Sequence, residues 1–485
     1  MECKNNKCLL FVILFFTLTF SSLTYANDSR VIVFILDGAP RDLLYGMIEN
    51  DSLPTLKKYF WDDGIHSKAT ITTFPSASAP AYQSFITGLF AGHSGIPYLQ
   101  RYNRLEQKKI DYLGSAYKRV NDDLQNFYAV GNANNGPITI FEGLKGDYTV
   151  SIYSEISRGA MVIRPKHLFG PLSDVFLSHR EENLDMRAMR EVKKIFSGSE
   201  IPKFTLVGLY STDVLQHKQG IASQDAKDAL RQFDLAMDEF IKLIQRRGVF
   251  DSTYIVVTSD HGMHNIDHKI SLKLDKKDVF ISERGVASAH LYFLKNDDVK
   301  KATISSLRGN SNLSLIIEKG DGGSIEVYSK ECHSTISKKD IGGHFYYGYE
   351  AHECDPLSYC NEPVIKKMCD GGFYDSRKWL ETTFDKSYPD GVVQLGQIFD
   401  DGRAGDVFIV SDRSGFYRNK KATHGSLMKD DMVVPLLMRG PGIKHGEFGP
   451  VRTVDLYPMM LEWLELPINE MRDGVLDAKF TIRQK

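Results

Sequence analysis

Runs of apolar residues rich in valine and isoleucine recur along the chain and alternate with segments of helical period. Five runs have the length and composition of buried strands: VIVFIL (31–36), FTLVGLY (204–210), YIVVTS (254–259), DVFIV (406–410) and VVPLLM (433–438). Strands that are apolar on both faces and separated by helices are typical of a parallel sheet with helices on both sides. The pattern therefore predicts an α/β fold with a mostly parallel sheet.

Two helices are clear from their apolar spacing. One carries an apolar residue at every third or fourth position from Leu230 to Ile244, and Gly248 is placed to end it. The other follows Thr453, where the apolar residues from Leu456 to Leu464 share one face. We expect both faces to pack against the sheet and to have no catalytic role.

The region of about 275–400 has a weaker periodicity and many glycines and tyrosines. We interpret it as an insertion in the α/β core, forming a cap region. This region contains four cysteines, Cys332, Cys354, Cys360 and Cys369.

The first 26 residues have the features of a secretory signal peptide. Lys4 and Lys7 precede an apolar stretch, and small and polar residues lead to a cleavage position after Ala26. An uncleaved membrane anchor is the alternative, but the apolar stretch is short for a membrane span. We therefore expect a secreted or periplasmic protein whose mature chain, residues 27–485, forms one catalytic domain and has no stable membrane span.

Export decides how the four cysteines are interpreted. An oxidising compartment favours two disulfides, and the sequence leaves all three pairings open. A zinc cluster is the alternative, but these cysteines include no CxxC pair.

The composition is that of an ordinary folded domain. Hydrophobic residues make up 42% of the chain and charged residues 25%, and the net charge is -2. Because the chain has no basic stripe and no long charge run, we expect no nucleic-acid binding.

Acidic residues and histidines cluster where the predicted strands end. In open parallel sheets, sites form outside the carboxyl ends of the strands, so residues far apart in sequence meet there. Carboxylate oxygen and imidazole nitrogen together suit zinc and similar metals. Each residue alone is more often a turn former or a structural residue, but together they form a candidate metal site: Asp37, Asp213, His217, Asp260, His261 and His424.

A hydroxyl group is placed to work with such a metal. In the segment SAPAYQSFITG (78–88), Ser78 is predicted as the N-cap of a helix, with Pro80 in the first turn. A capping role alone is the simplest interpretation. A helix N-terminus also attracts anions, however, and metal coordination activates a hydroxyl near neutral pH.

With these motifs in place, the chain resembles the alkaline phosphatase superfamily, and most of all its nucleotide pyrophosphatase/phosphodiesterase branch (type I phosphodiesterases). The resemblance extends from Val31 to about Pro467, with 275–400 matching poorly. It rests on FILDG, SAPAYQSFITGLFAGHSGI, DVLQH with KQG, SDHGM, and THGS with VVPLLMRGPGI. The family's nucleophile precedes a proline, ten residues before a glycine, and this position is Ser78.

The resemblance implies two metal ions, most simply Zn²⁺. Asp37, Ser78, Asp260 and His261 would hold one ion, and Asp213, His217 and His424 the other. Three carboxylates and the Ser78 alkoxide then balance the charge of two divalent cations, so an anionic phosphoester could enter without strong repulsion. The reaction implied has two steps and a phosphoseryl intermediate.

The expected substrate is a small phosphoester of nucleotide or lipid-head-group type, cleaved as a phosphodiester or pyrophosphate. A phosphomonoesterase and a phosphoryl-group transferase are the nearest alternatives, and a catalytically silent metal-binding surface protein is a third. A sulfatase is disfavoured, because Tyr82 stands where that branch has arginine.

The phosphate-binding residues depart from the family pattern. Leu99 stands where many of the diesterases have an asparagine, so Asn103 or Gln100 is a possible replacement. Arg158 matches the arginine of a K-x-R-G-A motif found in some phosphomonoesterases, but Ile156 replaces the lysine. Arg158 is thus a candidate phosphate ligand, with a surface arginine as the equal alternative.

Three further polar residues near these motifs are given no role as ligands or catalysts. His264 and His268 follow the SDHGM motif, but the seven-ligand set implied by the family is complete without them, so we expect them to be loop residues. Arg41, just after DGAP, is predicted to form an ion pair.

Overall fold

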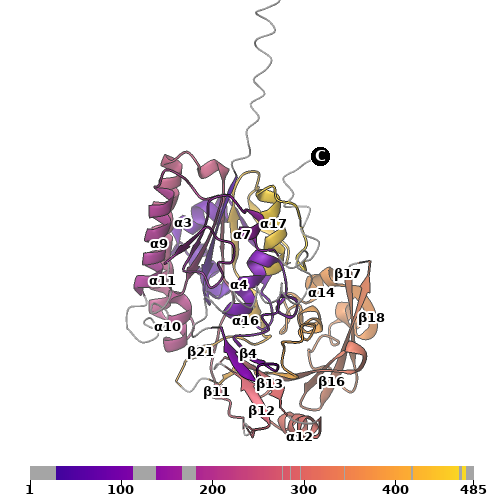
Figure 1. The fold of residues 1–485 in the computed structure, drawn as a ribbon. Helices are drawn as coiled ribbons and strands as arrows, with labels where there is room; N and C mark the ends of the chain where they lie inside the picture. Colours follow the sequence, from indigo (N-terminus) through magenta and orange to yellow (C-terminus); the bar gives the residue numbers. More distant parts are fainter. Residues whose placement is uncertain are drawn as a thin grey trace, which may run out of the picture.

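The computed structural model describes residues 29–476, with gaps at 113–137, 166–181 and 469–471 and at 273, 276, 284–285, 295–296, 343 and 417–418. The predicted signal peptide lies outside the described residues. Two large sheets lie beside one another. The first has helices packed against it, and the second lies at the lower right of Figure 1.

The first sheet is the core that the apolar runs predicted. It contains, in spatial order, β24 (Gly446–Phe448), β2 (Ile65–Ser67), β23 (Leu436–Arg439), β9 (Thr253–Thr258), β1 (Arg30–Leu36), β8 (Phe204–Leu209), β6 (Thr149–Ile152) and β7 (Val162–Arg164). The pairs from β9 to β7 are all parallel, and β23 alone runs against its two neighbours. A mostly parallel sheet is therefore confirmed.

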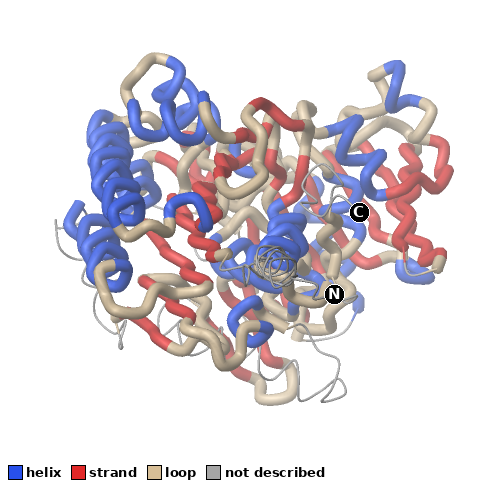
Figure 2. The backbone as a smooth tube through the Cα atoms, turned by 90° about the horizontal axis from the view of Figure 1, so that it is seen from above, coloured by secondary structure: helices blue, strands red, loops and turns tan. Residues whose placement is uncertain are grey.

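Strand β1 is buried on both faces because alternate side chains enter two different cores. Val33 and Ile35 belong to one hydrophobic cluster, and Phe34 and Leu36 to the other. The first cluster includes α4 (Ser78–Thr87), α7 (Ile140–Gly143) and α17 (Leu456–Trp463), and the second includes α9 (Glu182–Phe196) and α11 (Gln224–Arg246). Figure 2 shows the long helices as a layer on one side of the strands.

The two predicted helices are confirmed as α11 and α17. Besides these and the helices α4 and α9 given above, the described residues form α2 (Arg41–Glu49), α10 (Ser211–Gln219), α12 (Asp297–Arg308), α14 (Ser376–Thr383) and α15 (Gly391–Gly396). None of the helices among the described residues is both long enough and apolar enough to cross a bilayer.

The second sheet is antiparallel. It contains, in spatial order, β12 (Val279–Ser282), β13 (Ser288–Phe293), β19 (Val407–Val410), β14 (Leu315–Lys319), β15 (Ile325–Ser329), β16 (Cys332–Ile341), β17 (His344–Ala351) and β18 (Asp370–Asp375). Most of these strands come from the region of 275–400 that we interpreted as an insertion.

Two of the predicted strands do not form continuous strands of the parallel core. The run at 406–410 forms β19 in the antiparallel sheet, between β13 and β14, and not a strand of the parallel core. The run at 433–438 is broken by Pro435 into β22 (Val433–Val434) and β23, which lie in different sheets. Proline has no N–H to donate, so the ladder is interrupted there.

Two disulfides are present, as predicted. Cys332, the first residue of β16, pairs with Cys354, which lies after β17, and Cys360 pairs with Cys369. The pairing, which the sequence left open, is therefore between cysteines that are neighbours along the chain.

A buried ion pair joins the two parts of the molecule. Arg452 lies beside the parallel core and is 1% exposed, and its guanidinium donates to both oxygens of Asp390 at 2.7 and 2.8 Å. Asp390 precedes α15, whose Val392 and Val393 pack in the cluster that also contains Tyr347 of β17. Arg452 thus connects the core to α15, the helix that contacts β16 and β17 of the second sheet.

Candidate active site

Three neighbouring strands of the core end at the predicted metal ligands. Asp37 directly follows β1, Asp260 follows β9, and Asp213 lies in the first turn of α10, just after β8. Because β9, β1 and β8 are adjacent and parallel, their carboxyl ends meet at one edge of the sheet. The three carboxylates converge there, although the first and the last of them are more than 200 positions apart in the sequence.

The turn after β1 allows these carboxylates to approach. Gly38 has a φ of 64°, and a Cβ there would lie 2.9 Å from Cβ of Asp213. The Gly38 N–H donates to Oδ1 of Asp260 at 3.0 Å, and the Gln216 side chain donates to the Gly38 carbonyl at 2.9 Å. A side chain at position 38 would separate the strand ends.

The ligand side chains form two connected groups, one of Asp37, Asp213 and His261 and one of Asp213, His217 and His424. Nε2 of His261 lies 3.4 Å from Asp260 and 3.6 Å from Asp37. Oδ1 of Asp213 lies 3.4 Å from Nε2 of His217 and 3.9 Å from Nε2 of His424. The rings of His261 and His424 are stacked, with centroids 3.6 Å apart. Asp213 is therefore within reach of both groups.

The three histidines share one hydrogen-bond arrangement. In each, Nδ1 lies against a backbone carbonyl oxygen: Ala422 at 2.7 Å for His217, Gly262 at 2.9 Å for His261 and Ser76 at 2.9 Å for His424. A carbonyl can only accept, so Nδ1 carries the proton and Nε2 presents a lone pair. Metal-binding histidines are typically fixed in this way.

The three carboxylates each have one buried oxygen without a hydrogen-bond partner: Oδ1 of Asp37, Oδ1 of Asp213 and Oδ2 of Asp260. The other oxygen of Asp260 accepts from the N–H groups of Gly38 and His261, both at 3.0 Å. Buried carboxylate oxygens without partners are costly unless a cation meets them. The donor set therefore fits divalent cations at this position.

The electrostatics of the protein alone point the same way. Burial, followed by the neighbouring Asp260 and Asp213, raises the pKa of Asp37 well above its usual value, and burial raises the pKa of Asp260 to about 6. Burial lowers the pKa of His217 and of His424 to about 3. A cation binds to neutral imidazoles and ionised carboxylates. It would therefore find the histidines in the right state and would relieve the repulsion between the carboxylates.

Ser78 lies at the same place. It is the first residue of α4, and its Oγ is 3.4 Å from Nε2 of His261. The N-cap is Ala77, in extended conformation, and no side chain caps the helix, so the prediction of Ser78 as the N-cap was wrong by one residue. The hydroxyl is consequently not occupied by a capping bond and faces the ligand cluster. The helix N-terminus would also favour a phosphoryl group beside it.

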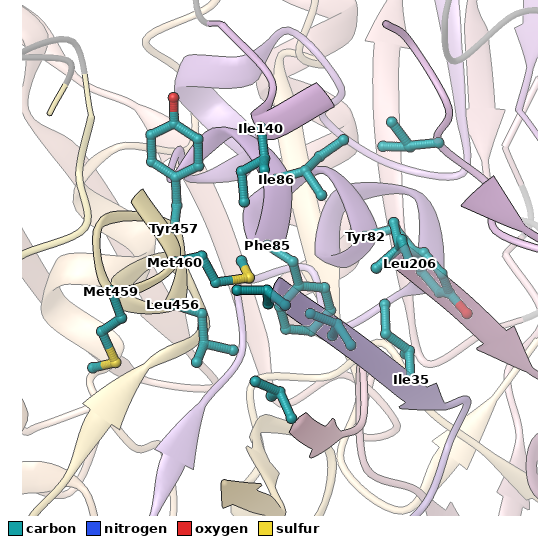
Figure 3. Packing of buried hydrophobic residues seen from close by; sticks show 14 of the residues in the cluster. Ile35, Tyr82, Phe85, Ile86, Ile140, Leu206, Leu456, Tyr457, Met459 and Met460 are labelled. Carbon is teal, nitrogen blue, oxygen red and sulfur yellow. The ribbon is translucent and has the colours of Figure 1, made fainter. Parts of the chain in front are cut away.

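Helix α4 is fixed by apolar packing over its length. All ten of its residues are buried, and Tyr82, Phe85 and Ile86 join the cluster that contains α17. Figure 3 shows Phe85 between the α17 side chains and β1, with Ile86 beside Ile140 of α7. The Ser78 end of the helix therefore has a defined position relative to the strand ends.

The predicted phosphate-binding residues have other contacts. Arg158 donates to Glu142 of α7 at 2.8 Å. The Asn103 side-chain oxygen accepts from the N–H groups of Leu105 and Glu106 in the turn between β4 (Gln100–Asn103) and β5 (Lys108–Asp111). Leu99 is buried in the core. Arg158 is also buried, so the alternative of a surface arginine is wrong, and its role as a phosphate ligand, like that of Asn103, stays a prediction.

The prediction of His264 and His268 as loop residues was wrong, because both lie in two-residue strands. Arg41 pairs with Asp42 at 2.5 Å, and His268 is exposed in a short strand, β11 (His268–Lys269). His264 is buried, and its Nδ1 lies 2.7 Å from Oδ1 of Asp431. His264 lies in β10 (His264–Asn265), which pairs with β21 (Ala422–Thr423), the strand that directly precedes His424. It thus helps to fix the position of His424.

The sequence analysis missed one carboxyl group. Glu155 follows β6 at the same edge of the sheet as Asp213, is 5% exposed, and has a buried Oε2 without a hydrogen-bond partner. Burial, then Asp260 and Asp213, raise its pKa to about 8. Glu155 lies outside the predicted strands and in no motif, so only its place after an unrecognised strand could have identified it.

Comparison with known proteins agrees with this geometry. The sequence profile described as "Type I phosphodiesterase / nucleotide pyrophosphatase" matches residues 31–424. Ectonucleotide pyrophosphatase/phosphodiesterase family member 7 of Rattus norvegicus is 24% identical over 212 residues, and the Mus musculus protein matches equally. This match covers 43% of the chain and 45% of the rat protein, so less than half of that relative is aligned.

Solved structures show the same fold over almost the whole chain. Human ectonucleotide pyrophosphatase/phosphodiesterase 5 superposes with a TM-score of 0.62 at 15% identity, covering 93% of this chain and 99% of that one. An inactive variant of the murine protein, in complex with AMP, superposes with a TM-score of 0.60 at the same identity and coverage.

Proposed function

Since the chain belongs to the type I phosphodiesterase/nucleotide pyrophosphatase family of phosphoester hydrolases, we propose that it is an exported, two-zinc phosphodiesterase that forms a phosphoseryl intermediate at Ser78. The observation that carries this proposal is the convergence of six ligand side chains beside one hydroxyl. Three of them are carboxylates with a buried oxygen that has no hydrogen-bond partner, and three are imidazoles whose Nδ1 donates to a backbone carbonyl.

Two groups of side chains would share the cations. Asp37, Asp260 and His261, together with Ser78, would hold one cation, and Asp213, His217 and His424 would hold the other. Three nitrogen and three carboxylate ligands suit zinc better than magnesium or calcium, which prefer oxygen alone. When bound, the cations lower the pKa of a hydroxyl and stabilise developing negative charge on oxygen.

The protein's own residues carry the bond changes. Ser78 Oγ forms a bond to phosphorus while the bond from phosphorus to the leaving oxygen breaks, and the serine proton is balanced on the released group. Water then attacks the phosphoseryl group, which returns Ser78 and releases a phosphate monoester. The fixed end of α4 holds the nucleophile in position, and the positive end of the helix dipole would favour the phosphoryl oxygens.

A single panel of substrates tests this proposal. Mature protein with zinc would be assayed on bis-p-nitrophenyl phosphate, p-nitrophenyl phosphate and p-nitrophenyl sulfate. We expect the diester to react fastest. Preference for the monoester would replace the proposal by a phosphomonoesterase, and formation of a phosphorylated alcohol from an added acceptor would favour a phosphoryl-group transferase. No turnover by zinc-loaded protein would indicate a metal-binding surface protein.

The role of Ser78 needs its own control. Ser78→Ala should abolish turnover and retain zinc, as measured by metal analysis, and acid-quenched wild-type protein should contain phosphate on the peptide that includes Ser78. Ser84→Ala is the matched variant, because Ser84 is in the same helix and its hydroxyl donates to the Ala81 carbonyl at 2.7 Å. It should remain active.

The predicted export is tested separately. The peptide 1–26, followed by a reporter, should direct secretion, and the N-terminus of the exported protein should be Asn27. An N-terminus that still contains the apolar stretch would show a retained anchor.

A further inference from the structure

A fully buried carboxylate, that of Asp431 in α16 (Lys429–Met432), is bonded to the segments that carry two of the proposed histidine ligands. Its Oδ2 accepts from the N–H of Ser426 at 2.9 Å and from the Ser426 hydroxyl at 2.7 Å. Its Oδ1 lies 2.7 Å from Nδ1 of His264, which carries the proton because a carboxylate accepts. Both oxygens are therefore engaged by the protein, so Asp431 is not itself a cation ligand.

A chain of hydrogen bonds leads from Oδ2 of Asp431 to His424. The Ser426 carbonyl accepts from the Ser76 hydroxyl at 2.6 Å, and the Ser76 carbonyl accepts from Nδ1 of His424 at 2.9 Å. Asp431, Ser426, Ser76 and His424 are all buried, so water does not replace a bond that is lost. The orientation of the His424 ring thus depends on Ser426, and the position of Ser426 depends on the carboxylate.

The other oxygen of the carboxylate acts on the same histidine through the backbone. Oδ1 holds His264 in β10, and the strand partner of His264 is Thr423, the residue directly before His424. Ser426 lies two residues after His424. The two oxygens of Asp431 therefore hold the chain on both sides of this one ligand.

His261 is connected to Asp431 in a different way. The backbone carbonyl of Asp431 accepts from the N–H of Gly262 at 2.8 Å, and the Gly262 carbonyl accepts from Nδ1 of His261 at 2.9 Å. A Cβ at Gly262 would lie 1.9 Å from the carbonyl oxygen of Asp430, so the two segments are in close contact. This connection uses the main chain of residue 431 and does not depend on its side chain.

Building on the proposed function, we propose that the Asp431 carboxylate is a positioning residue for His424. It would control the affinity for the cation that Asp213, His217 and His424 hold, with little effect on the other cation. Residues that orient a metal ligand from behind typically contribute about 10- to 100-fold to metal affinity.

Asparagine has the shape of aspartate and cannot replace it here. The amide has one accepting oxygen, so its NH2 group would face either the donors of Ser426 or the Nδ1–H of His264. In either orientation two donors meet, and the chain on that side of His424 loses its support. Asp431→Asn therefore removes the proposed function of the side chain and leaves the backbone bond to Gly262 possible.

Competition with a zinc chelator tests the proposal. In Asp431→Asn protein, one of the two zinc ions should bind about 10- to 100-fold more weakly, and the other should change by less than about 3-fold. The same change is then made in His217→Ala protein, where we expect only the ion at Asp37, Asp260 and His261 to remain. There it should alter zinc affinity by less than about 3-fold, which would identify the ion that depends on Asp431.

The visible absorption of bound Co²⁺ gives a second readout apart from turnover, because it depends on the geometry of the ligands. The spectrum of Co²⁺-loaded Asp431→Asn protein should differ from that of wild type. Asp234→Asn is the matched control: Asp234 of α11 is 1% exposed and accepts from the N–H groups of Thr55 and Leu56 in α3 (Pro54–Leu56) at 3.1 and 2.8 Å. This variant should lower the free energy of unfolding and leave the zinc affinities and the Co²⁺ spectrum unchanged.

Ser76→Ala tests the chain of hydrogen bonds, and it replaces the first test if Asp431→Asn protein does not fold. Without the Ser76 hydroxyl, the Ser426 carbonyl loses its partner, so the same zinc ion should bind about 3- to 10-fold more weakly. Because both residues act through Ser426, the loss in the double variant should be smaller than the sum of the two single losses, expressed as free energies.

The outcomes separate this inference from the proposed function. If wild-type protein binds no zinc or hydrolyses no phosphodiester, the proposed function fails. If it does both, but Asp431→Asn keeps both zinc affinities or weakens them equally, the positioning role is overturned while the proposed function stands. An equal effect of Asp234→Asn, or additive losses with Ser76→Ala, would overturn it as well.

Discussion

Replacing Glu155 by glutamine should stabilise the metal-free protein at alkaline pH and change it little near pH 5. Glu155 is 5% exposed, and its Oε2 is buried without a hydrogen-bond partner. Burial, then Asp260 and Asp213, raise its pKa from 4.5 to about 8. Between these values the folded protein keeps a proton that the unfolded chain has released, so stability falls as pH rises.

The size of the effect follows from linkage. Each pH unit is worth about 1.36 kcal/mol. Relative to the fully protonated state, the raised pKa of Glu155 lowers the free energy of unfolding by about 1 kcal/mol at pH 5 and by about 5 kcal/mol at pH 9, where the loss has levelled off. Glutamine has the same shape and does not ionise. The stability of Glu155→Gln relative to wild type should therefore rise by about 4 kcal/mol between pH 5 and pH 9.

Urea unfolding of both proteins in chelator, followed by circular dichroism at pH 5, 7 and 9, measures this difference. With saturating zinc the difference should shrink, because cations at Asp213 and Asp260 would compensate the Glu155 charge. A difference in the free energy of unfolding that is the same at pH 5 and pH 9 would refute the reasoning. It would mean that Glu155 ionises in the folded protein as it does in the unfolded chain.

Three further changes test other parts of the structure. Arg452→Met should lower the free energy of unfolding by about 3–5 kcal/mol in urea titrations, because it leaves Asp390 buried without its partner. Replacing Cys332 and Cys354 by serine should cost about 3 kcal/mol at a sequence separation of 22, measured in the same way without reductant. His217→Ala should reduce bound zinc from two ions to about one by metal analysis, and unchanged zinc content would exclude it as a ligand.

The parallel core could be predicted from the sequence because its signal is local. A strand that is buried on both faces must be apolar at every position, and 31–36, 204–210 and 254–259 coincide with β1, β8 and β9 to within one residue. The polar residues that follow such strands then lie at one edge, whatever their separation in sequence.

The surroundings of the later strands could not be predicted in this way. The apolar run at 406–410 has the same composition in either kind of sheet, and only its pairing with β13 and β14 shows that it is antiparallel. The composition of a strand does not determine its direction in the sheet. The direction depends on how the connecting segments before and after the strand pack in the fold.

Glu155, which the sequence analysis missed, differs from the ligands in one respect. Asp37 and Asp260 directly follow strong strand signals, whereas Glu155 follows the short strand β6. Its raised pKa comes from burial beside other carboxyl groups, which is a property of the folded chain alone.

The site and the fold depend on one another in this protein. The carboxyl groups of Asp37, Asp213, Asp260 and Glu155 are all buried, and burial raises the pKa of each. The hydrophobic clusters on both faces of β1 fix the strand ends and so force these groups together. Cations that bind only the folded chain would relieve this repulsion and add their binding free energy to its stability. The same unfavourable charges that make the metal-free protein less stable at high pH would therefore make the site selective for divalent cations.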